Sequence, residues 1–150
     1  MIKITNGDII QKFKTGEYSG LIQGCNCFNT QNSGIAGQLR SEFPEAYQAD
    51  LKTVRGDRSK LGTFSSATTE FGFIYNCYTQ FRYGNDGNRY LDYEALYMSL
   101  ELVRNRHRFE REGLLIPKIG CGLAGGNWNI VRTMIFEIFS DKNVTLVSLG

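Results

Sequence analysis

The stretch IGCGLAGGNW, residues 119–128, joins the apolar run LLIP to NWNIVRTMIFEIF, a segment whose apolar residues recur with a helical period. Its glycines Gly120, Gly122 and Gly125 spell G-x-G-x-x-G, a pattern that also occurs in dinucleotide-binding loops. Glycines between a strand and a helix let backbone amides approach an anion, and the helix N-terminus adds partial positive charge. The stretch therefore predicts either an anion-binding loop or a tightly packed glycine-rich turn.

Neither of the two common phosphate motifs fits this stretch. A dinucleotide fingerprint needs a following strand that ends in an acidic residue, whereas Asp141 precedes the last predicted strand. A P-loop needs Lys-Ser or Lys-Thr after its glycines, whereas Lys118 stands before them. An anion-binding loop of another kind is the remaining functional interpretation.

A second loop of similar composition occurs earlier in the chain. The segment NCFNTQNSGIAGQL, residues 26–39, joins a predicted strand to a predicted helix through small polar residues and Gly34. Two loops rich in free amides suit a ligand with two phosphates. We therefore expect a diphosphate ligand.

Composition limits the other function classes. The 150 residues are 41% apolar and 21% charged, which predicts a single folded domain over residues 1–150. The net charge is only +2, with lysines and arginines spread along the chain, and this does not favour a nucleic-acid partner. The N-terminus MIKITNGDII has no secretion signal and no window is long enough to span a bilayer, so we expect a cytoplasmic location without membrane contact.

The four cysteines are Cys25, Cys27, Cys77 and Cys121. Their spacing, one C-x-C pair and two distant single residues, is a poor match to a zinc site. In a chain without a secretion signal, disulfides are also disfavoured. We expect free cysteines, buried as small apolar residues, and no metal site.

The remaining sequence alternates between strand and helix patterns. We expect strands in IKI, YSGLIQGCNCF, GTFSSATTEF, GFIYNCYTQF, LLIPKI and NVTLVSL, and helices in IAGQLRSEF, EAYQADLKTV, DYEALYMSLELVRNRHRF and NWNIVRTMIFEIF. Asp92 is the expected N-cap of its helix, and His107, near the end of that helix, is expected at the surface or as a cap. This alternation predicts a layered α/β domain around a central sheet.

Several ordered motifs also carry a family resemblance. They are TNGDII, GCNCFNTQNSGIAGQL followed by FPEAY, KLGTFSSA, YNCYTQFRYG, DYEAL and PKIGCGLAGGNW. Over nearly its whole length the chain resembles the macro domains that bind ADP-ribose. The versions PKIGCGLAGGNW and YTQFRYG look like a subgroup of bacteria and their phages, similar to the yeast-type ADP-ribose 1″-phosphate phosphatases and the deacylase-like hydrolases. The resemblance implies a three-layer α/β/α macro domain with a central mixed sheet, and a host-cytoplasmic protein if it is phage-encoded.

The resemblance also implies roles for individual residues. Asp8 would accept the adenine amino group beside the amide of Ile9, although Asp8 could equally be an N-cap, and Asn26 would lie by the distal ribose. One loop against the diphosphate would be Ser33, Gly34, Ile35 and Ala36, and the opposing loop Gly122, Leu123, Ala124, Gly125 and Gly126. Tyr83 and Trp128 could be pocket walls or core residues, and the remaining members of the expected binding set are Gly7, Asn32, Thr79, Gly120 and Cys121. The ligand would be ADP-ribose or a derivative, with no cofactor and a monomeric protein.

Three departures from the family weaken any assignment of catalysis. The hydrolase branch has a lysine where this chain has Gln80 and, in some members, an acid where it has Ala124. The phosphatase pattern has a histidine where this chain has Gln23. Asn26 and Gln80 remain as candidates to orient an attacking water, and neither is a good base at neutral pH. Three functions stay open: a slow phosphatase-like hydrolase acting at the distal ribose, a binder without turnover, and an ADP-ribosyl-adduct hydrolase without the usual lysine.

Overall fold

The computed structural model describes residues 1–32 and 34–149 of the chain. In chain order the elements are β1 (Ile2–Asn6), α1 (Ile9–Lys14), β2 (Gly20–Cys25), α2 (Gly34–Glu42), α3 (Pro44–Leu51), the short 3-10 helix η1 (Arg58–Lys60), β3 (Phe64–Thr68), β4 (Phe73–Tyr78), α4 (Tyr93–Arg106), β5 (Leu114–Pro117), α5 (Trp128–Ile138) and β6 (Val144–Ser148). Within this part all the strands and helices expected from the sequence patterns are present, together with two short helices, α1 and η1, that were not expected.

Polar side chains fix where several helices begin. The carboxylate of Asp92 accepts a hydrogen bond of 3.0 Å from the amide of Ala95, which confirms Asp92 as the N-cap of α4. Asn127 caps α5, and Pro44 occupies the first turn of α3. Each cap satisfies an amide that the helix itself leaves without a partner.

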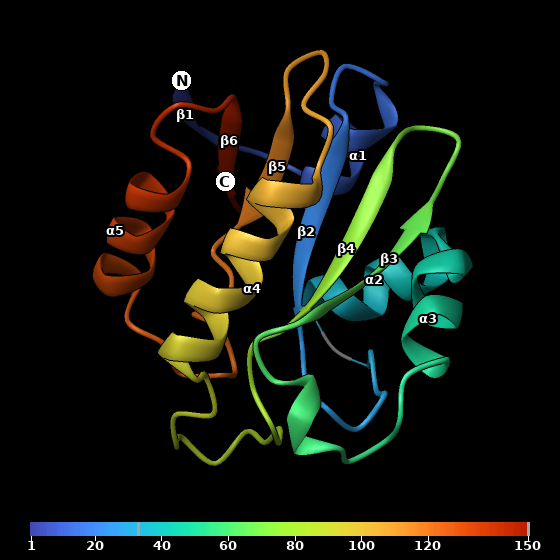
Figure 1. Cartoon of the computed structure of the whole chain (residues 1–150), viewed down its shortest axis with the longest axis vertical. Helices are drawn as coiled ribbons and strands as arrows, with labels where there is room; N and C mark the ends of the chain where they lie inside the picture. Colours follow the sequence, from blue (N-terminus) through green and yellow to red (C-terminus); the bar gives the residue numbers. More distant parts are fainter. Residues whose placement is uncertain (33, 150) are drawn as a thin grey trace.

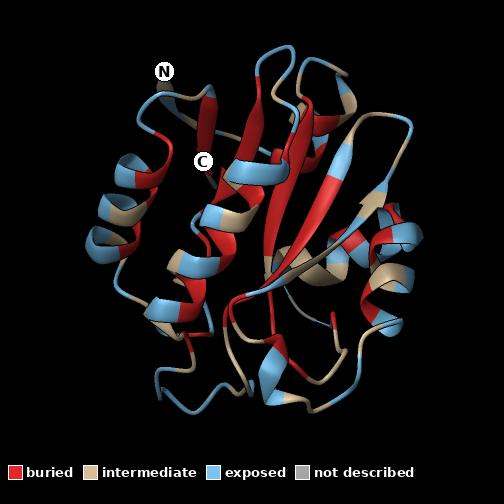
Figure 2. Ribbon diagram, viewed as in Figure 1, coloured by how far each residue is buried: buried red, intermediate tan, exposed pale blue. Residues whose placement is uncertain are grey.

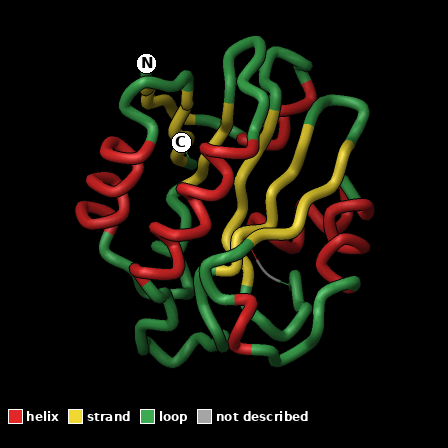
Figure 3. Tube along the Cα trace, viewed as in Figure 1, coloured by secondary structure: helices red, strands yellow, loops and turns green. Residues whose placement is uncertain are grey.

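The strands form one mixed sheet in the order β1-β6-β5-β2-β4-β3. Neighbouring strands pair in parallel throughout, except that β3 runs antiparallel to β4. Figure 3 shows the strands side by side between the helices. The central mixed sheet expected from the sequence is confirmed.

Helices cover both faces of this sheet (Figure 1). One hydrophobic cluster packs α4 and α5 against side chains such as Ile22 and Leu146, and a second packs α1, α2 and α3 against side chains such as Leu21 and Leu115. Adjacent residues of one strand thus enter opposite cores, as the period of two in a strand requires. Figure 2 shows the resulting buried sheet between helices with exposed outer faces, so the three-layer α/β/α architecture is confirmed.

The strand order places a topological switch between β2 and β5. After β2 the chain forms β3 and β4 on one side of β2, and after β5 it forms β6 on the other side of β5. In open α/β sheets, ligands bind outside the carboxyl ends of the strands at such a point. The loops that leave β2 and β5 there are the two loops that the sequence singles out.

The structure corrects the expectation for His107. Its backbone caps α4, but the residue is only 6% exposed instead of lying at the surface. Its ring lies between Ser19 and Tyr75, with Nε2 2.8 Å from the serine hydroxyl and Nδ1 2.6 Å from the tyrosine hydroxyl. Because both partners belong to distant segments, the sequence around His107 alone did not indicate its burial.

Candidate functional site

The loop after β5 presents a row of free backbone amides. The amide of Cys121 donates to the carbonyl of Lys118, and the amide of Gly125 donates to the carbonyl of Gly122. Between them, the three amides of residues 122–124 donate to no acceptor among the described residues. Consecutive free amides of this kind make an anion-binding concavity, and α5 begins directly after the loop.

The glycines of this loop fall into two groups, according to the space around the missing Cβ. A Cβ on Gly120 or Gly126 would lie within 2.6 Å of the Leu91 side chain, and one on Gly125 would lie 3.1 Å from the Cα of Arg89. These three glycines are therefore required by close packing against residues 88–91. A Cβ on Gly122 would meet nothing within 4 Å, and the fold itself leaves room for a side chain there.

The loop after β2 is fastened by side chains of its own. The Asn26 amide nitrogen donates to the Thr30 hydroxyl at 2.7 Å, and its oxygen accepts from the amide of Phe28 at 2.8 Å. Asn26 therefore shapes the loop at the end of β2. Asn32 is exposed and accepts a hydrogen bond of 2.9 Å from Arg40.

The helix that follows this loop begins where the resemblance places phosphate contacts. Gly34, Ile35 and Ala36 form the first turn of α2, at the same end of the sheet as the loop after β5. Gly34 has a φ of +58° and open space around its missing Cβ. Ser33, also expected in this loop, lies outside the described residues.

Asp8 lies at the carboxyl end of β1 and caps α1. Its Oδ1 accepts hydrogen bonds from the amides of Ile10 at 2.9 Å and Gln11 at 3.3 Å. The side chain is exposed, while Ile9 is buried beneath it. The preceding Gly7 has a φ of +138° and donates its amide to Ser148 at the end of β6. The N-cap role is thus observed, and Oδ2 has no hydrogen-bond donor among the described residues.

Thr79 and Gln80 follow directly after β4. The Thr79 hydroxyl is fully buried and has no hydrogen-bond partner within the described part of the chain. It lies 3.0 Å from where a Cβ on Gly24 would stand, and Ile119 is 3.1 Å from the same point. The Gln80 side chain donates to the carbonyl of Arg82 at 2.8 Å. The ends of β2 and β4 and the loop after β5 therefore meet around Gly24.

The two expected aromatic walls differ in their surroundings. Tyr83 is 54% exposed, in the loop between β4 and α4. Trp128 is partly buried against the core beneath α4 and α5, with the Lys118 ammonium 5.7 Å from its ring centre. Trp128 is thus partly a core residue, and Tyr83 is available at the surface.

Titratable groups near the site offer little base or nucleophile chemistry. Burial raises the pKa of the Cys121 thiol, and also that of Cys27 despite the nearby Lys60. These thiols are therefore protonated at neutral pH. Among the described residues, no three His, Cys, Asp or Glu side chains gather as a metal site would require, and no helix is long and apolar enough to cross a membrane.

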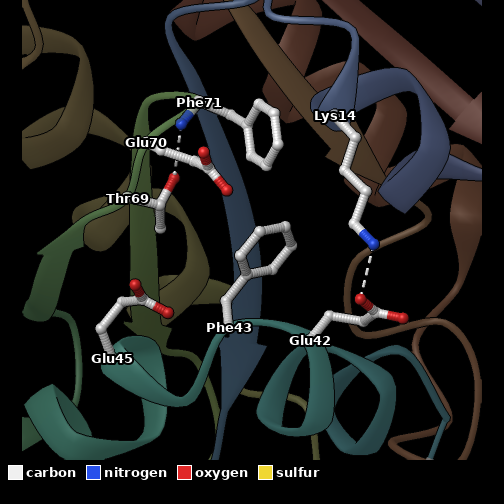
Figure 4. Close-up of a pocket in the computed structure, with 7 residues that line it drawn as sticks. All are labelled: Lys14, Glu42, Phe43, Glu45, Thr69, Glu70 and Phe71. Carbon is white, nitrogen blue, oxygen red and sulfur yellow. Dashed lines mark hydrogen bonds and ion pairs between the residues drawn. The ribbon is translucent and has the colours of Figure 1, made fainter.

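A separate hollow lies at the amino end of the strands, away from these loops (Figure 4). Glu42, Glu45 and Glu70 line it, and the one lysine there, Lys14, already forms an ion pair of 2.6 Å with Glu42. Three carboxylates beside one paired lysine do not suit a diphosphate. This hollow is therefore not the anion site.

Comparisons with known proteins concern the family and the fold of the chain. No protein-family model matches the sequence. The chain is similar to an uncharacterised 17.5 kDa protein of the tk-vs intergenic region of Enterobacteria phage T4, with 34% identity over 155 residues that cover 98% of this chain and 96% of the phage protein. At this level of similarity the two proteins belong to one family.

Solved structures identify the fold. The macrodomain of Thermus aquaticus DarG superposes with a TM-score of 0.77 at 19% identity and covers 100% of this chain and 98% of its own. A macrodomain protein from Streptomyces coelicolor gives a TM-score of 0.72 at 22% identity, with both chains covered at 100%. The protein has the macro domain fold. Thermosipho africanus DarTG, solved in complex with ADP-ribose, gives a TM-score of 0.74 at 16% identity over 97% of this chain and 41% of that chain.

One residue beneath the candidate site, Lys60, could not be predicted from the sequence. Lys60 is only 7% exposed, and its ammonium reaches beneath the loop after β2. Lysines are almost always exposed, and KLGTFSSA gave no signal that this one is not. The burial of Lys60 becomes visible only in the three-dimensional structure.

Proposed function

We propose that this macro domain binds ADP-ribose or an ADP-ribosyl derivative at the carboxyl ends of β2 and β5. The observation that carries the proposal is the row of free amides at Gly122, Leu123 and Ala124. Free amides are favourable only when water or a ligand accepts their hydrogen bonds, and a phosphate group can accept several at once. The ADP-ribose complex of Thermosipho DarTG, which has the same fold, supports this choice of ligand.

The remaining contacts of the proposed site follow from its position in the sheet. Asp8 stands at the end of β1, two strands from β5, and its free Oδ2 would accept the adenine amino group. Asn26 and Gln80 stand at the ends of β2 and β4, where the distal ribose would lie. The ligand would thus cross the strand ends from β1 to β4, with its diphosphate at the switch point.

We propose binding as the main activity and expect hydrolysis at the distal ribose to be slow. Both polar atoms of the Asn26 side chain are occupied within its loop, and the Gln80 amide nitrogen bonds Arg82. An amide side chain can orient a water, but it cannot accept its proton at neutral pH. With ADP-ribose 1″-phosphate we expect saturable binding and little phosphate release.

A nuclear magnetic resonance titration tests the proposed site. ADP-ribose should shift the amide resonances of residues 122–124 at saturation, whereas adenosine, which has no phosphate, should leave those three amides near their free positions. Tyr75 in β4 provides an internal reference away from the loops. If ADP-ribose binds and the amides of residues 122–124 do not respond, the diphosphate lies elsewhere and the proposal is wrong.

A further inference from the structure

The loop after β2 is held from beneath by a buried ammonium. Lys60 Nζ donates to the carbonyl of Cys27 at 3.1 Å and to the side-chain oxygen of Asn29 at 2.6 Å. Lys60 belongs to η1, more than twenty-five residues along the chain from this loop, so the contact is tertiary and not a local turn. The loop conformation therefore depends on a side chain outside it.

One residue of the loop has an uncommon backbone conformation that the Lys60 contact helps to hold. Asn29 has a φ of +59°, in the left-handed region that residues other than glycine seldom adopt. Its side-chain oxygen accepts from Lys60, and its side-chain nitrogen donates to the carbonyl of Thr53 at 2.9 Å. These two bonds fix the Asn29 side chain and with it the unusual backbone.

The second support of the loop is Asp50, a buried residue of α3. Its carboxylate accepts from Gln31 at 3.2 Å and from the Tyr78 hydroxyl at 2.7 Å. The ring of Tyr78 lies between the two charged groups, with Lys60 Nζ 4.8 Å from the ring centre. Lys60 thus holds the loop at Cys27 and Asn29, and Asp50 holds it at Gln31.

A buried lysine is a costly way to stabilise a fold. An ammonium in the interior loses hydration, and an apolar side chain of similar length avoids that loss. What a methionine at position 60 could not supply is the pair of hydrogen bonds to Cys27 and Asn29. The distinctive contribution of Lys60 is therefore the geometry of the loop that begins with Asn26.

We propose that Lys60 is a positioning residue of the ligand site, which holds residues 26–32 in the conformation that accepts the distal ribose. The ligand part of this inference rests on the proposed function. Asn26 begins the loop, and its own bonds to Thr30 and Phe28 lie within it. Release of Cys27 and Asn29 would move Asn26 while leaving the loop after β5 in place.

The test compares Lys60→Met with Lys3→Met and measures two ligands by calorimetry. ADP-ribose carries the distal ribose and ADP does not. Lys60→Met should weaken ADP-ribose binding at least tenfold and leave ADP binding within about threefold, since only the distal contact is lost. Lys3→Met removes the same charge from an exposed lysine of β1 that pairs with Glu112 at 3.3 Å, so it should leave the binding of both ligands within about threefold of the native protein.

A second measurement needs no ligand. The amides of Cys27 and Phe28 are hydrogen-bonded, to the Phe81 carbonyl and to Asn26, and should exchange slowly in the native protein. In Lys60→Met their hydrogen exchange should accelerate at least tenfold more than that of the β4 amide of Tyr75.

The outcomes separate this inference from the proposed function. Equal weakening of both ligands, no weakening of either, or the same split in Lys3→Met would overturn the positioning role of Lys60. Unchanged exchange at Cys27 and Phe28 would overturn it as well. If the native protein binds neither ligand, the proposed function is wrong, and the exchange measurement alone decides whether Lys60 positions the loop.

Discussion

The hydroxyl of Tyr75 and Nδ1 of His107 lie 2.6 Å apart in the interior, at the end of the sheet remote from the ligand loops. The Ser19 hydroxyl can donate to the Gly113 carbonyl at 3.2 Å while it accepts from His107 Nε2. In that arrangement Nδ1 accepts from Tyr75, and the imidazole is neutral with its proton on Nε2. The interior is therefore built around an uncharged histidine.

Acid should destabilise the protein through this histidine. Burial, with a smaller opposing effect from Glu110, lowers the pKa of His107 from 6.5 to about 4. Between these values the unfolded chain binds a proton that the folded protein does not, so the free energy of unfolding falls as the pH drops from about 6.5 towards 4. The full loss is about 3 kcal/mol, from roughly 1.4 kcal/mol per unit.

Urea unfolding at a series of pH values measures this effect. The variant His107→Leu is the control, and its unfolding free energy should lose this part of the pH dependence even if it is lower throughout. The same slope between pH 6.5 and 4 in the variant and the native protein would assign the effect to other groups.

Asp8→Asn should separate the two roles of Asp8. Asparagine is an N-cap as good as aspartate, so the stability of α1 should change by less than about 0.5 kcal/mol. Its amide group can place a donor where the adenine amino group needs an acceptor, and ADP-ribose binding should weaken by about 1–3 kcal/mol. Calorimetry with adenosine and inosine provides the control, because the native protein should prefer adenosine. An unchanged dissociation constant in folded Asp8→Asn would mean that Asp8 only caps the helix.

Much of the fold could be predicted from local patterns, because those patterns are themselves local physics. Asp92 before an amphipathic segment and the β-branched and aromatic residues of β3 and β4 each carry their meaning within about ten residues. The burial of a single polar residue, by contrast, cannot be predicted from the residues next to it in the sequence. His107 and Lys60 are surrounded in sequence by ordinary surface residues, and their partners come from distant segments.

The glycine-rich stretch illustrates the same limit within the site. Its sequence predicted a loop at the end of a strand, and the structure confirms that placement. It could not show that Gly120, Gly125 and Gly126 are set by packing against residues 88–91, while Gly122 faces open space. The distinction depends on Arg89 and Leu91, which belong to the loop between β4 and α4.

Gly125→Ala should therefore act on stability. Gly125 has a φ of +74°, and a Cβ there would lie 3.1 Å from both the Arg89 Cα and the Asn88 carbonyl oxygen. The left-handed conformation alone should cost about 1–2 kcal/mol, seen as a lower midpoint in thermal unfolding. Gly34→Ala is a useful comparison, since it has a similar φ of +58° but no neighbour within 4 Å. If Gly125→Ala is not the more destabilising of the two, packing against Arg89 does not constrain the loop.

Thiol titration should distinguish Cys121 from the other cysteines. Cys25, Cys27 and Cys77 are buried, whereas Cys121 is partly exposed in the glycine-rich loop. An aromatic disulfide reagent should modify Cys121 slowly in the native protein, because burial raises the pKa of its thiol, and all four cysteines after denaturation. Saturating ADP-ribose should slow the native reaction further. Equal rates with and without ADP-ribose would place the ligand away from this loop.

Calorimetry of Gly122→Val is the sharpest test of whether the amides of residues 122–124 hold the diphosphate of ADP-ribose. Gly122 has no positive φ and open space about its missing Cβ, so valine should leave the unfolding midpoint nearly unchanged while its side chain covers the free amides. We expect saturable one-to-one binding by the native protein and at least a hundredfold weaker binding by the variant. Native-like affinity in a folded Gly122→Val protein would contradict it.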